Sequence, residues 1–158
     1  MASHPLEHVI QAADRAITAG KLDALMNFYA PDATLVVKPG LNVSGRDNIR
    51  AAFVKIAEYV MHSLVVRQGR VEVIEGGDTA LVIMESLLDY VEQGRPVSVT
   101  RRATCVFRLE ADGKWRCLVD NSYGTDLLDV ADGPPGRRNS SSIAASTPVL
   151  AASTAPAR

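Results

Sequence analysis

The chain has 158 residues, of which 47% are hydrophobic and 22% are charged, as expected of one soluble domain with a single core. Its net charge of −1 comes from 17 basic and 18 acidic residues spread along the chain, which argues against nucleic acid as a partner. No apolar stretch of about 18 residues is present, so no membrane span is expected and a cytoplasmic location follows by default.

The first sixty residues are predicted to form three helices and one strand. The first helix, which Gly20 can end, has one apolar stripe made of Leu6, Val9, Ile10, Ala13 and Ile17. A second short helix must stop before Pro31 and carries Leu22, Leu25, Met26 and Tyr29. Residues 33–37 are predicted as a strand and residues 38–45 as a loop. Ser44 is placed to cap a third helix with apolar positions Ile49, Ala52, Phe53, Ile56 and Val60.

From Ser63 onward the sequence has the pattern of long β-strands. Turn signals at residues 76–78, 93–96 and 112–113 separate segments of about ten residues or more. Strands joined in series form antiparallel sheets, so we expect an α+β domain in which three N-terminal helices pack on a strongly curved antiparallel sheet, which can close into a cone-shaped barrel. This domain is predicted to span residues 1–132. Residues 133–158, rich in Ser, Ala and Pro, are predicted to be a disordered tail.

One arginine interrupts an otherwise apolar strand face. In residues 97–109 the odd positions are apolar except for Arg101. An arginine does not lose its charge on burial, so Arg101 must be paired, exposed at the rim of the sheet, or directed at an anionic ligand. A structural ion pair and ligand binding are equally compatible with the sequence.

The last hairpin leaves open which polar residue faces the interior. Residues 110–114 suit a tight turn, so the two flanking strands should pair. A three-residue loop brings Asn121 near Ala103, whereas a four-residue loop or a bulge brings Asp120 beside Cys105. A shift of one residue in register therefore decides the chemistry of the interior.

The polar run of Asp120, Asn121 and Ser122 is the main candidate for a functional site. Desolvation raises the pKa of a carboxylate on the floor of an apolar cavity, which suits it to general acid or base catalysis near neutral pH. An adjacent amide can orient a substrate carbonyl. A strand end that bonds to loop backbone or to a second subunit explains the run equally well. In residues 79–91, one largely apolar face carries the hydroxyl groups of Ser86 and Tyr90, as expected of a pocket wall or of a solid core.

No cofactor or metal is expected. The sequence has no G-x-G-x-x-G motif, so hydride chemistry is not proposed. Cys105 and Cys117 are too few for a disulfide framework and lack C-x-x-C spacing. His4 and His8 lie four residues apart with no further ligand nearby in the sequence.

Several segments together resemble the nuclear transport factor 2-like superfamily: AGKLDALMNFYAPDATLVVKPG, SGRDNIRAAF and ATCVFRLEADGKWRCLVDN. The ending DGKWRCLVDNSYGTD is most similar to the SnoaL-like and SgcJ/EcaC-like branch. The resemblance covers about residues 6–127. It implies a cone-shaped α+β barrel, an apolar cavity between sheet and helices, and a homodimer formed through the sheet.

The resemblance also allows active-site patterns to be compared by position. The ketosteroid isomerase pattern is not matched, because Lys38 stands in place of the catalytic acid, Ala13 in place of a tyrosine, and Cys105 in place of a protonated aspartate. The SnoaL-type cyclases and limonene-type epoxide hydrolases have a functional aspartate in the last strand, and Asp120 matches it.

That match favours the register in which Leu118, Asp120 and Ser122 face the cavity. The epoxide hydrolase pattern also needs a second acid partnered through an arginine. Arg101 can supply the arginine, but the neighbouring residues Ala103 and Cys105 supply no second carboxylate.

We therefore expect a cofactor-independent enzyme of isomerase, cyclase or lyase type that acts on a small apolar or aromatic metabolite by proton transfer. Asp120 is the predicted catalytic acid or base. The residues predicted to bind the substrate are Asn121, Arg101, Tyr90, Cys105 and Ser122. The alternative is a non-catalytic dimeric module of the same fold that binds a ligand or drives oligomerisation.

Overall fold

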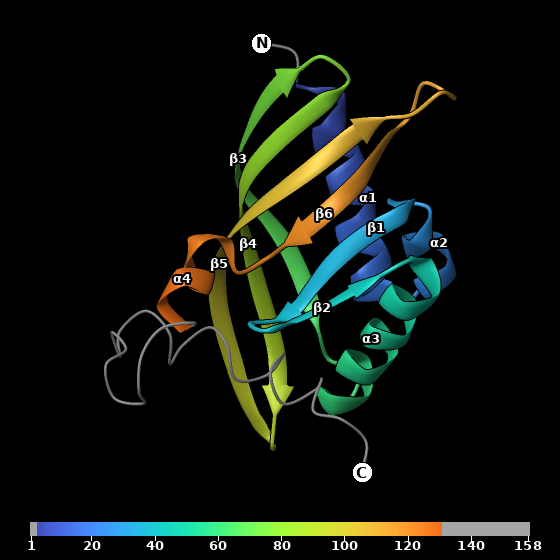
Figure 1. Ribbon diagram of the computed structural model, residues 1–158. Coiled ribbons are helices and arrows are strands. Elements are labelled where there is room, and N and C mark those ends of the chain that lie inside the picture. The colour runs from blue at the N-terminus through green and yellow to red at the C-terminus, as the bar shows by residue number, and fades with distance from the viewer. Residues whose placement is uncertain (1–2, 131–158) are drawn as a thin grey trace.

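The computed structural model describes residues 3–130, which form helices packed on a single sheet (Figure 1). The helices are α1 (Pro5–Ala19), α2 (Leu22–Met26), α3 (Arg46–Tyr59), the 3-10 helix η1 (Gly124–Asp126) and α4 (Leu127–Val130). The strands are β1 (Tyr29–Lys38), β2 (Leu41–Ser44), β3 (Val65–Gly76), β4 (Thr79–Glu92), β5 (Arg95–Leu109) and β6 (Trp115–Asn121). The predicted α+β class is confirmed. The predicted tail, residues 133–158, lies outside the described residues.

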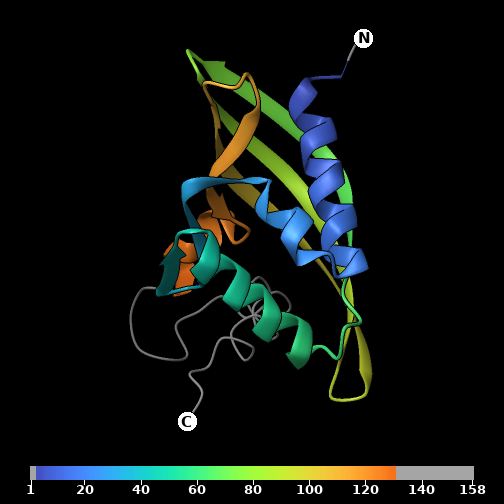
Figure 2. The same cartoon turned by 90° about the vertical axis from the view of Figure 1, so that its right-hand side faces the viewer.

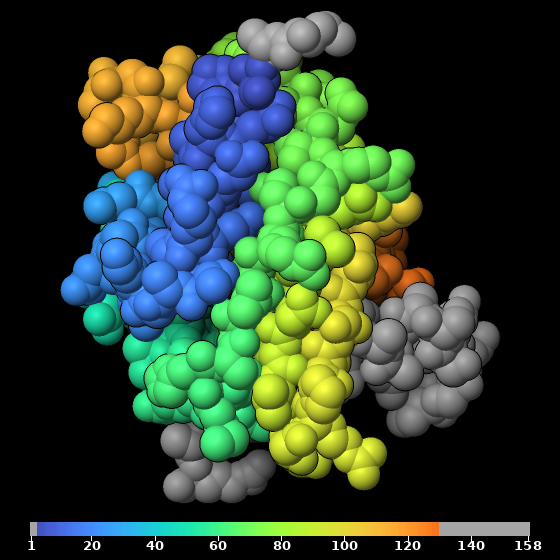
Figure 3. All heavy atoms as spheres, turned by 180° about the vertical axis from the view of Figure 1, so that it is seen from behind, coloured from blue at the N-terminus to red at the C-terminus, as the bar shows by residue number. Residues whose placement is uncertain are grey.

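The six strands lie in the order β2-β1-β6-β5-β4-β3 and curl without closing, so β2 and β3 are the edges. Neighbouring strands are antiparallel except β1 and β6, which pair in parallel. The expectation of a wholly antiparallel sheet is wrong at that pair, because β6 returns beside β1 after four intervening strands rather than through a hairpin. Figure 2 shows α1 running lengthwise beside the long strands, and Figure 3 shows it lying alongside β3.

Helix α1 begins and ends where the sequence predicts. Its first turn is fixed by His4, whose Nδ1 accepts a hydrogen bond from the backbone of Leu6 at 3.0 Å, and by Glu7, whose carboxylate accepts one from the backbone of His4 at 3.2 Å. Gly20 ends the helix in the left-handed conformation, with φ 72°. One face of α1 is thereby held against the interior.

Two predicted boundaries between residues 27 and 45 are wrong. Tyr29 begins strand β1 rather than ending a helix, since α2 stops at Met26. Residues 38–45 are not only a loop, because Leu41–Ser44 form strand β2 beside β1. Ser44 does not cap α3; its hydroxyl group bonds to that of Thr34 at 2.8 Å, and Gly45 occupies the cap position.

The core lies between the inner face of the sheet and the helices. The predicted inward faces of β4 and β5 are confirmed, and their buried apolar residues are Ala80, Val82, Met84, Leu88, Tyr90, Val99, Ala103, Cys105 and Phe107. Burial of such side chains contributes roughly 1.5 to 3 kcal/mol each. These two strands therefore form a well-packed wall on which the site is built.

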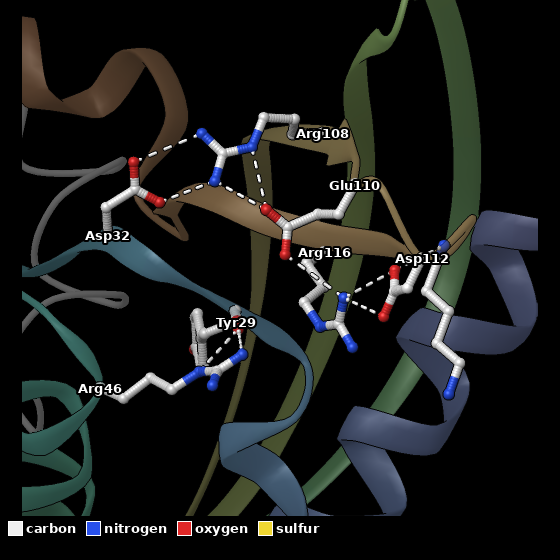
Figure 4. Close-up of polar contacts among 8 residues, drawn as sticks. Tyr29, Asp32, Arg46, Arg108, Glu110, Asp112 and Arg116 are labelled. Carbon is white, nitrogen blue, oxygen red and sulfur yellow. Dashed lines mark hydrogen bonds and ion pairs between the residues drawn. The ribbon is translucent and has the colours of Figure 1, made fainter.

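An ion-pair chain outside the core ties β1, β5 and β6 together (Figure 4). Arg108 bonds to Asp32 at 2.7 Å and to Glu110 at 2.7 Å, and Glu110 in turn contacts Arg116 at 3.3 Å. Arg116 also bonds to Asp112 at 2.9 Å. These ion pairs link β1 to β5 and β6, strands that no hairpin joins to β1.

Within residues 3–130 there is no helix that is both long enough and apolar enough to cross a membrane.

Candidate functional site

A largely apolar cavity of about 120 Å³ lies between the sheet and the helices. Its helical wall comes from α1, α2 and α3, and its sheet wall from β1, β3, β4, β5 and β6. The polar side chains on its surface are those of Asp14, Tyr29, Ser86, Tyr90, Arg101, Asp120 and Ser122. A mostly apolar cavity with a few polar groups is the usual form of a small-molecule site.

A bulge in β6 directs Asp120 into this cavity. Near the turn, Phe107 pairs with Cys117; beyond it, Val106 pairs with Val119, so Leu118 is an extra residue without a partner. The extra residue shifts the register, and Asp120 comes to lie opposite Cys105. The simple hairpin register holds before the bulge, and the register suggested by the family comparison holds after it.

The Asp120 carboxyl group is enclosed by protein, and it keeps accessible surface because it lines the cavity. The hydroxyl group of Tyr29 donates to its Oδ2 at 2.6 Å, and the thiol of Cys105 donates to its Oδ1 at 3.5 Å. Burial raises the pKa of Asp120, and these two hydrogen bonds oppose the rise. The geometry holds the carboxyl group in one orientation while leaving it able to exchange a proton.

Tyr29 is a residue that the sequence did not single out. It is fully buried at the start of β1, and its carbonyl oxygen accepts two hydrogen bonds from Arg46, at 3.0 and 2.7 Å (Figure 4). Burial, and then the charge of Asp120, raise the pKa of Tyr29 well above its usual range. Tyr29 therefore stays protonated and acts as a fixed donor to Asp120.

Asp14 is the second carboxyl group of the cavity, and the sequence prediction missed it. It comes from α1, four residues after Ile10 on the helix's apolar face, and it lines the cavity. Burial, and then the negative charge of Asp120, raise its pKa to about 7. An acidic residue inside an apolar helical stripe was the available signal. Asp14 on α1 is thus a second carboxyl group in the cavity, where β5 has none beside Arg101.

Arg101 is the positively charged group of the cavity wall. Its side chain is only 3% exposed, and among the described residues its Nε and Nη2 atoms have no hydrogen-bond partner. The Tyr123 ring lies beneath it, 4.4 Å from the guanidinium carbon. Burial lowers the pKa of Arg101, yet a guanidinium group stays charged at physiological pH.

The other predicted substrate contacts divide into two groups. Tyr90 and Ser122 line the cavity, and burial raises the pKa of Tyr90 to about 12, which keeps its hydroxyl group protonated. Cys105 lies behind Asp120 as a hydrogen-bond donor and is not part of the cavity lining. Its direct contact with a substrate is therefore not supported.

Asn121 is placed away from the cavity, which corrects its prediction as a substrate contact. Its Nδ2 donates to the hydroxyl group of Thr104 at 3.0 Å and to the carbonyl oxygen of Gly124 at 3.2 Å, and its Oδ1 accepts from the backbone of Tyr123. The register shift at Leu118 turns Asn121 outward, where it fixes the turn after β6. Leu118 itself does not line the cavity either.

Comparisons with known proteins agree with this architecture. A profile of the SnoaL-like domain family matches residues 9–118, a segment that ends just before Asp120. A search of curated proteins found no significant match. The family match therefore covers most of the described fold and ends two residues before Asp120.

Three solved structures illustrate the fold. An NTF2-like protein with a cystatin-like fold from Novosphingobium aromaticivorans is 21% identical, with a TM-score of 0.64, over 73% of this chain and 76% of that one. A proposed dehydratase of the NTF2-like family from Streptomyces avermitilis is 21% identical, with a TM-score of 0.62, over 73% of this chain and 91% of that one. The CaMKII hub of S. rosetta is 20% identical, with a TM-score of 0.63, over 76% of this chain and 96% of that one. At these identities the likeness shows the shared fold alone.

Proposed function

This chain belongs to the SnoaL-like domain family, and on that premise we propose that it is a cofactor-independent enzyme that transfers a proton on a small, largely apolar molecule. The observation that carries the proposal is the Asp120 carboxyl group, which lines the apolar cavity and is oriented there by Tyr29. A structural carboxylate has no need of an apolar cavity at its side. A general base does, because desolvation brings its pKa toward the working pH.

In this proposal the two carboxyl groups have complementary states. Asp120, held by two donors, is the ionised base that removes a proton from the substrate. Asp14, with its pKa of about 7, is protonated for part of the time and can return a proton to a second atom of the substrate. Paired carboxyl groups in different environments commonly divide acid and base roles in this way.

Arg101 and Tyr90 hold the oxygen atom of the substrate. Both line the cavity with buried donor groups, and a buried cation stabilises negative charge that develops on an oxygen atom during proton removal. Such a fixed donor typically contributes about 100-fold or more to the rate. Ser122, also on the wall, is a further donor for the same oxygen.

The size of the cavity limits the substrate. A volume of about 120 Å³ is close to that of cavities that hold one benzene ring, which is on the order of 150 Å³. We therefore propose a substrate with a single ring or of similar bulk. Isomerisation and dehydration both fit this machinery, and the proposed dehydratase from Streptomyces avermitilis with the same fold supports that class of reaction.

The test is deuterium exchange. Single-ring carbonyl compounds with acidic C–H bonds are incubated with the protein in D₂O, and incorporation is followed by NMR. We expect exchange by the natural protein and a loss of about 100-fold or more in Asp120→Asn. The control is Asp23→Asn, which removes a surface carboxylate whose side chain is 90% exposed. Equal exchange by the natural protein and Asp120→Asn would contradict the proposal.

A second candidate, an oligomerisation module, rests on the outer face of the sheet. Ile74, Leu81 and Ile83 are 51%, 39% and 41% exposed there, and Ile74 pairs with Leu81 across β3 and β4. Clustered apolar side chains on a sheet commonly mark an interface. We propose a homodimer through this face, as the hub of S. rosetta shares the fold. Light scattering tests it by comparing the natural protein, expected to be dimeric, with Ile83→Lys, expected to be monomeric.

The cytoplasmic location stays a prediction.

A further inference from the structure

Arg101 is a buried cation without an anionic partner. Its side chain is 3% exposed, and within residues 3–130 no carboxylate lies within ion-pair distance of it. Leaving the donors of a buried charged group without partners costs free energy that the cation–π contact with Tyr123 offsets only in part. A structural arginine would be expected to have a carboxylate beside it. The unpaired state points to a ligand instead.

The two unpaired nitrogen atoms define the shape of that ligand. Nε and Nη2 lie on the same edge of the planar guanidinium group, and their N–H bonds point the same way. A carboxylate presents two oxygen atoms at the matching spacing and accepts both hydrogen bonds at once. A single carbonyl oxygen would satisfy one of them. This edge of Arg101 therefore matches a carboxylate.

The charge of the cavity limits the ligand to a monoanion. Arg101 is the only cationic side chain among the described residues that line the cavity, and Asp14 and Asp120 are the acidic ones. With Asp120 ionised, as the proposed function requires, one carboxylate already opposes the guanidinium charge in this cavity, so each charge on the ligand adds to the negative charge there. A carboxylate adds one such charge, whereas a dianion such as a phosphate monoester adds two.

We propose that the ligand of this cavity is a small monocyclic carboxylic acid, bound as its carboxylate to the Nε and Nη2 edge of Arg101 with its ring among the apolar side chains. This inference rests on the proposed function, which it narrows to one class of substrate.

Arg101 and Asp120 lie at different positions along the sheet wall of the cavity. Cys105, which lies opposite Asp120, is four residues from Arg101 on β5, or roughly 13 Å along the strand. In this proposal the carboxylate is held at Arg101 and the ring extends through the cavity toward Asp120 and Asp14, where the proton is transferred.

The test compares benzoate with benzamide, which have the same ring and nearly the same shape but differ in charge. Binding to the natural full-length protein is measured by calorimetry or by NMR. Two charge-assisted hydrogen bonds should make benzoate bind about 10- to 100-fold more tightly than benzamide. In Arg101→Met, benzoate should fall to the affinity of benzamide, whose own affinity stays the same.

Equal binding of the two compounds to the natural protein, no binding of either, or a preference for benzoate that persists in Arg101→Met would each overturn the proposal. Folding is checked by thermal unfolding; because no carboxylate of residues 3–130 pairs with Arg101, and its guanidinium group is in contact with the Tyr123 ring, Arg101→Met should unfold at a similar temperature or higher. If that variant does not fold, Arg101→Lys replaces it, since it keeps the charge but loses the paired edge and should lose most of the preference.

Asp120→Asn separates this proposal from the proposed function. It should retain the preference for benzoate while losing deuterium exchange. A protein that prefers benzoate but shows no exchange that depends on Asp120 would refute the enzyme and leave the ligand class standing. Exchange that depends on Asp120 without a preference for benzoate would refute the ligand class and leave the enzyme standing.

Discussion

Asp14 on α1 and Asp120 on β6 line the same cavity, and the charge of Asp120 contributes to the raised pKa of Asp14. One comes from the helical wall and the other from the sheet. Their coupling makes the cavity responsive to pH near neutrality, and it allows the arrangement to be tested without knowing the substrate.

The first prediction concerns Asp14→Asn. The pKa of Asp14 rises from 3.8 to about 7 on folding, so the folded state binds more protons than the unfolded state between these values. Stability should therefore fall as the pH rises through this window. At about pH 8 the variant should be more stable than the natural protein by at least about 1 kcal/mol, and at about pH 4 the two should be alike. Urea unfolding at both pH values measures this. Equal stability at both would show that Asp14 is solvated.

The second prediction concerns Tyr29→Phe. The tyrosine hydroxyl group bonds to Asp120 at 2.6 Å and opposes the rise in its pKa. Without that donor the pKa of Asp120 should rise further, and the fold should lose roughly 1 to 3 kcal/mol. Carbon-13 NMR of labelled aspartate follows the titration. Tyr59→Phe is the control, because Tyr59 donates to Glu92 away from the cavity; a similar shift there would argue against a specific role for Tyr29.

The third prediction concerns Gly124→Ala. Gly124 has φ 56°, and a Cβ atom there would lie 2.1 Å from the carbonyl oxygen of Arg102. Strain and clash together should cost more than about 3 kcal/mol. Gly77→Ala is the matched control, with φ 62° and no atom within 4 Å, and should cost about 1 kcal/mol. Chemical denaturation compares the two; equal losses would mean that the backbone after β6 moves freely.

The fourth prediction concerns Arg108→Gln. The hydrogen bond from Arg108 holds the pKa of Asp32 below its usual range, so this pair stabilises the fold above the unfolded pKa and the contribution is lost as the pH falls. In the variant, the pKa of Asp32 should rise toward its ordinary value, because the hydrogen bond from Arg108 is the largest cause that lowers it. Carbon-13 titration measures it, with Arg50→Gln, whose partner is Asp23, as the control. If the pKa of Asp32 is unchanged in Arg108→Gln, groups other than Arg108 must stabilise its ionised form.

Periodicity predicted most of the fold because the long strands obey it. On β4 and β5 the alternation of side chains gave the correct buried faces, including Arg101 and Tyr90. It failed at Tyr29, whose spacing continues a helical stripe although the chain has already turned into β1. Tyr29 is a strand residue because it pairs with Cys117 of β6, and a local sequence pattern gives no information on a pairing between such distant segments.

The site was less predictable because it depends on contacts between distant segments. The position of Asp120 relies on the extra residue at Leu118, which alternation alone does not reveal. Asp14 was missed because an acidic residue in a helix is ordinarily solvated, and only tertiary packing buries it. Asn121 was included because the register was open at that point.

The extra residue at Leu118 divides β6 into two segments with different contacts. Trp115 and Cys117, before it, pack against the core, and Asp120, after it, lines the cavity. The alternation of side chains reverses between the two segments, so that an odd-numbered residue, Cys117, and an even-numbered one, Asp120, both face the interior of the molecule.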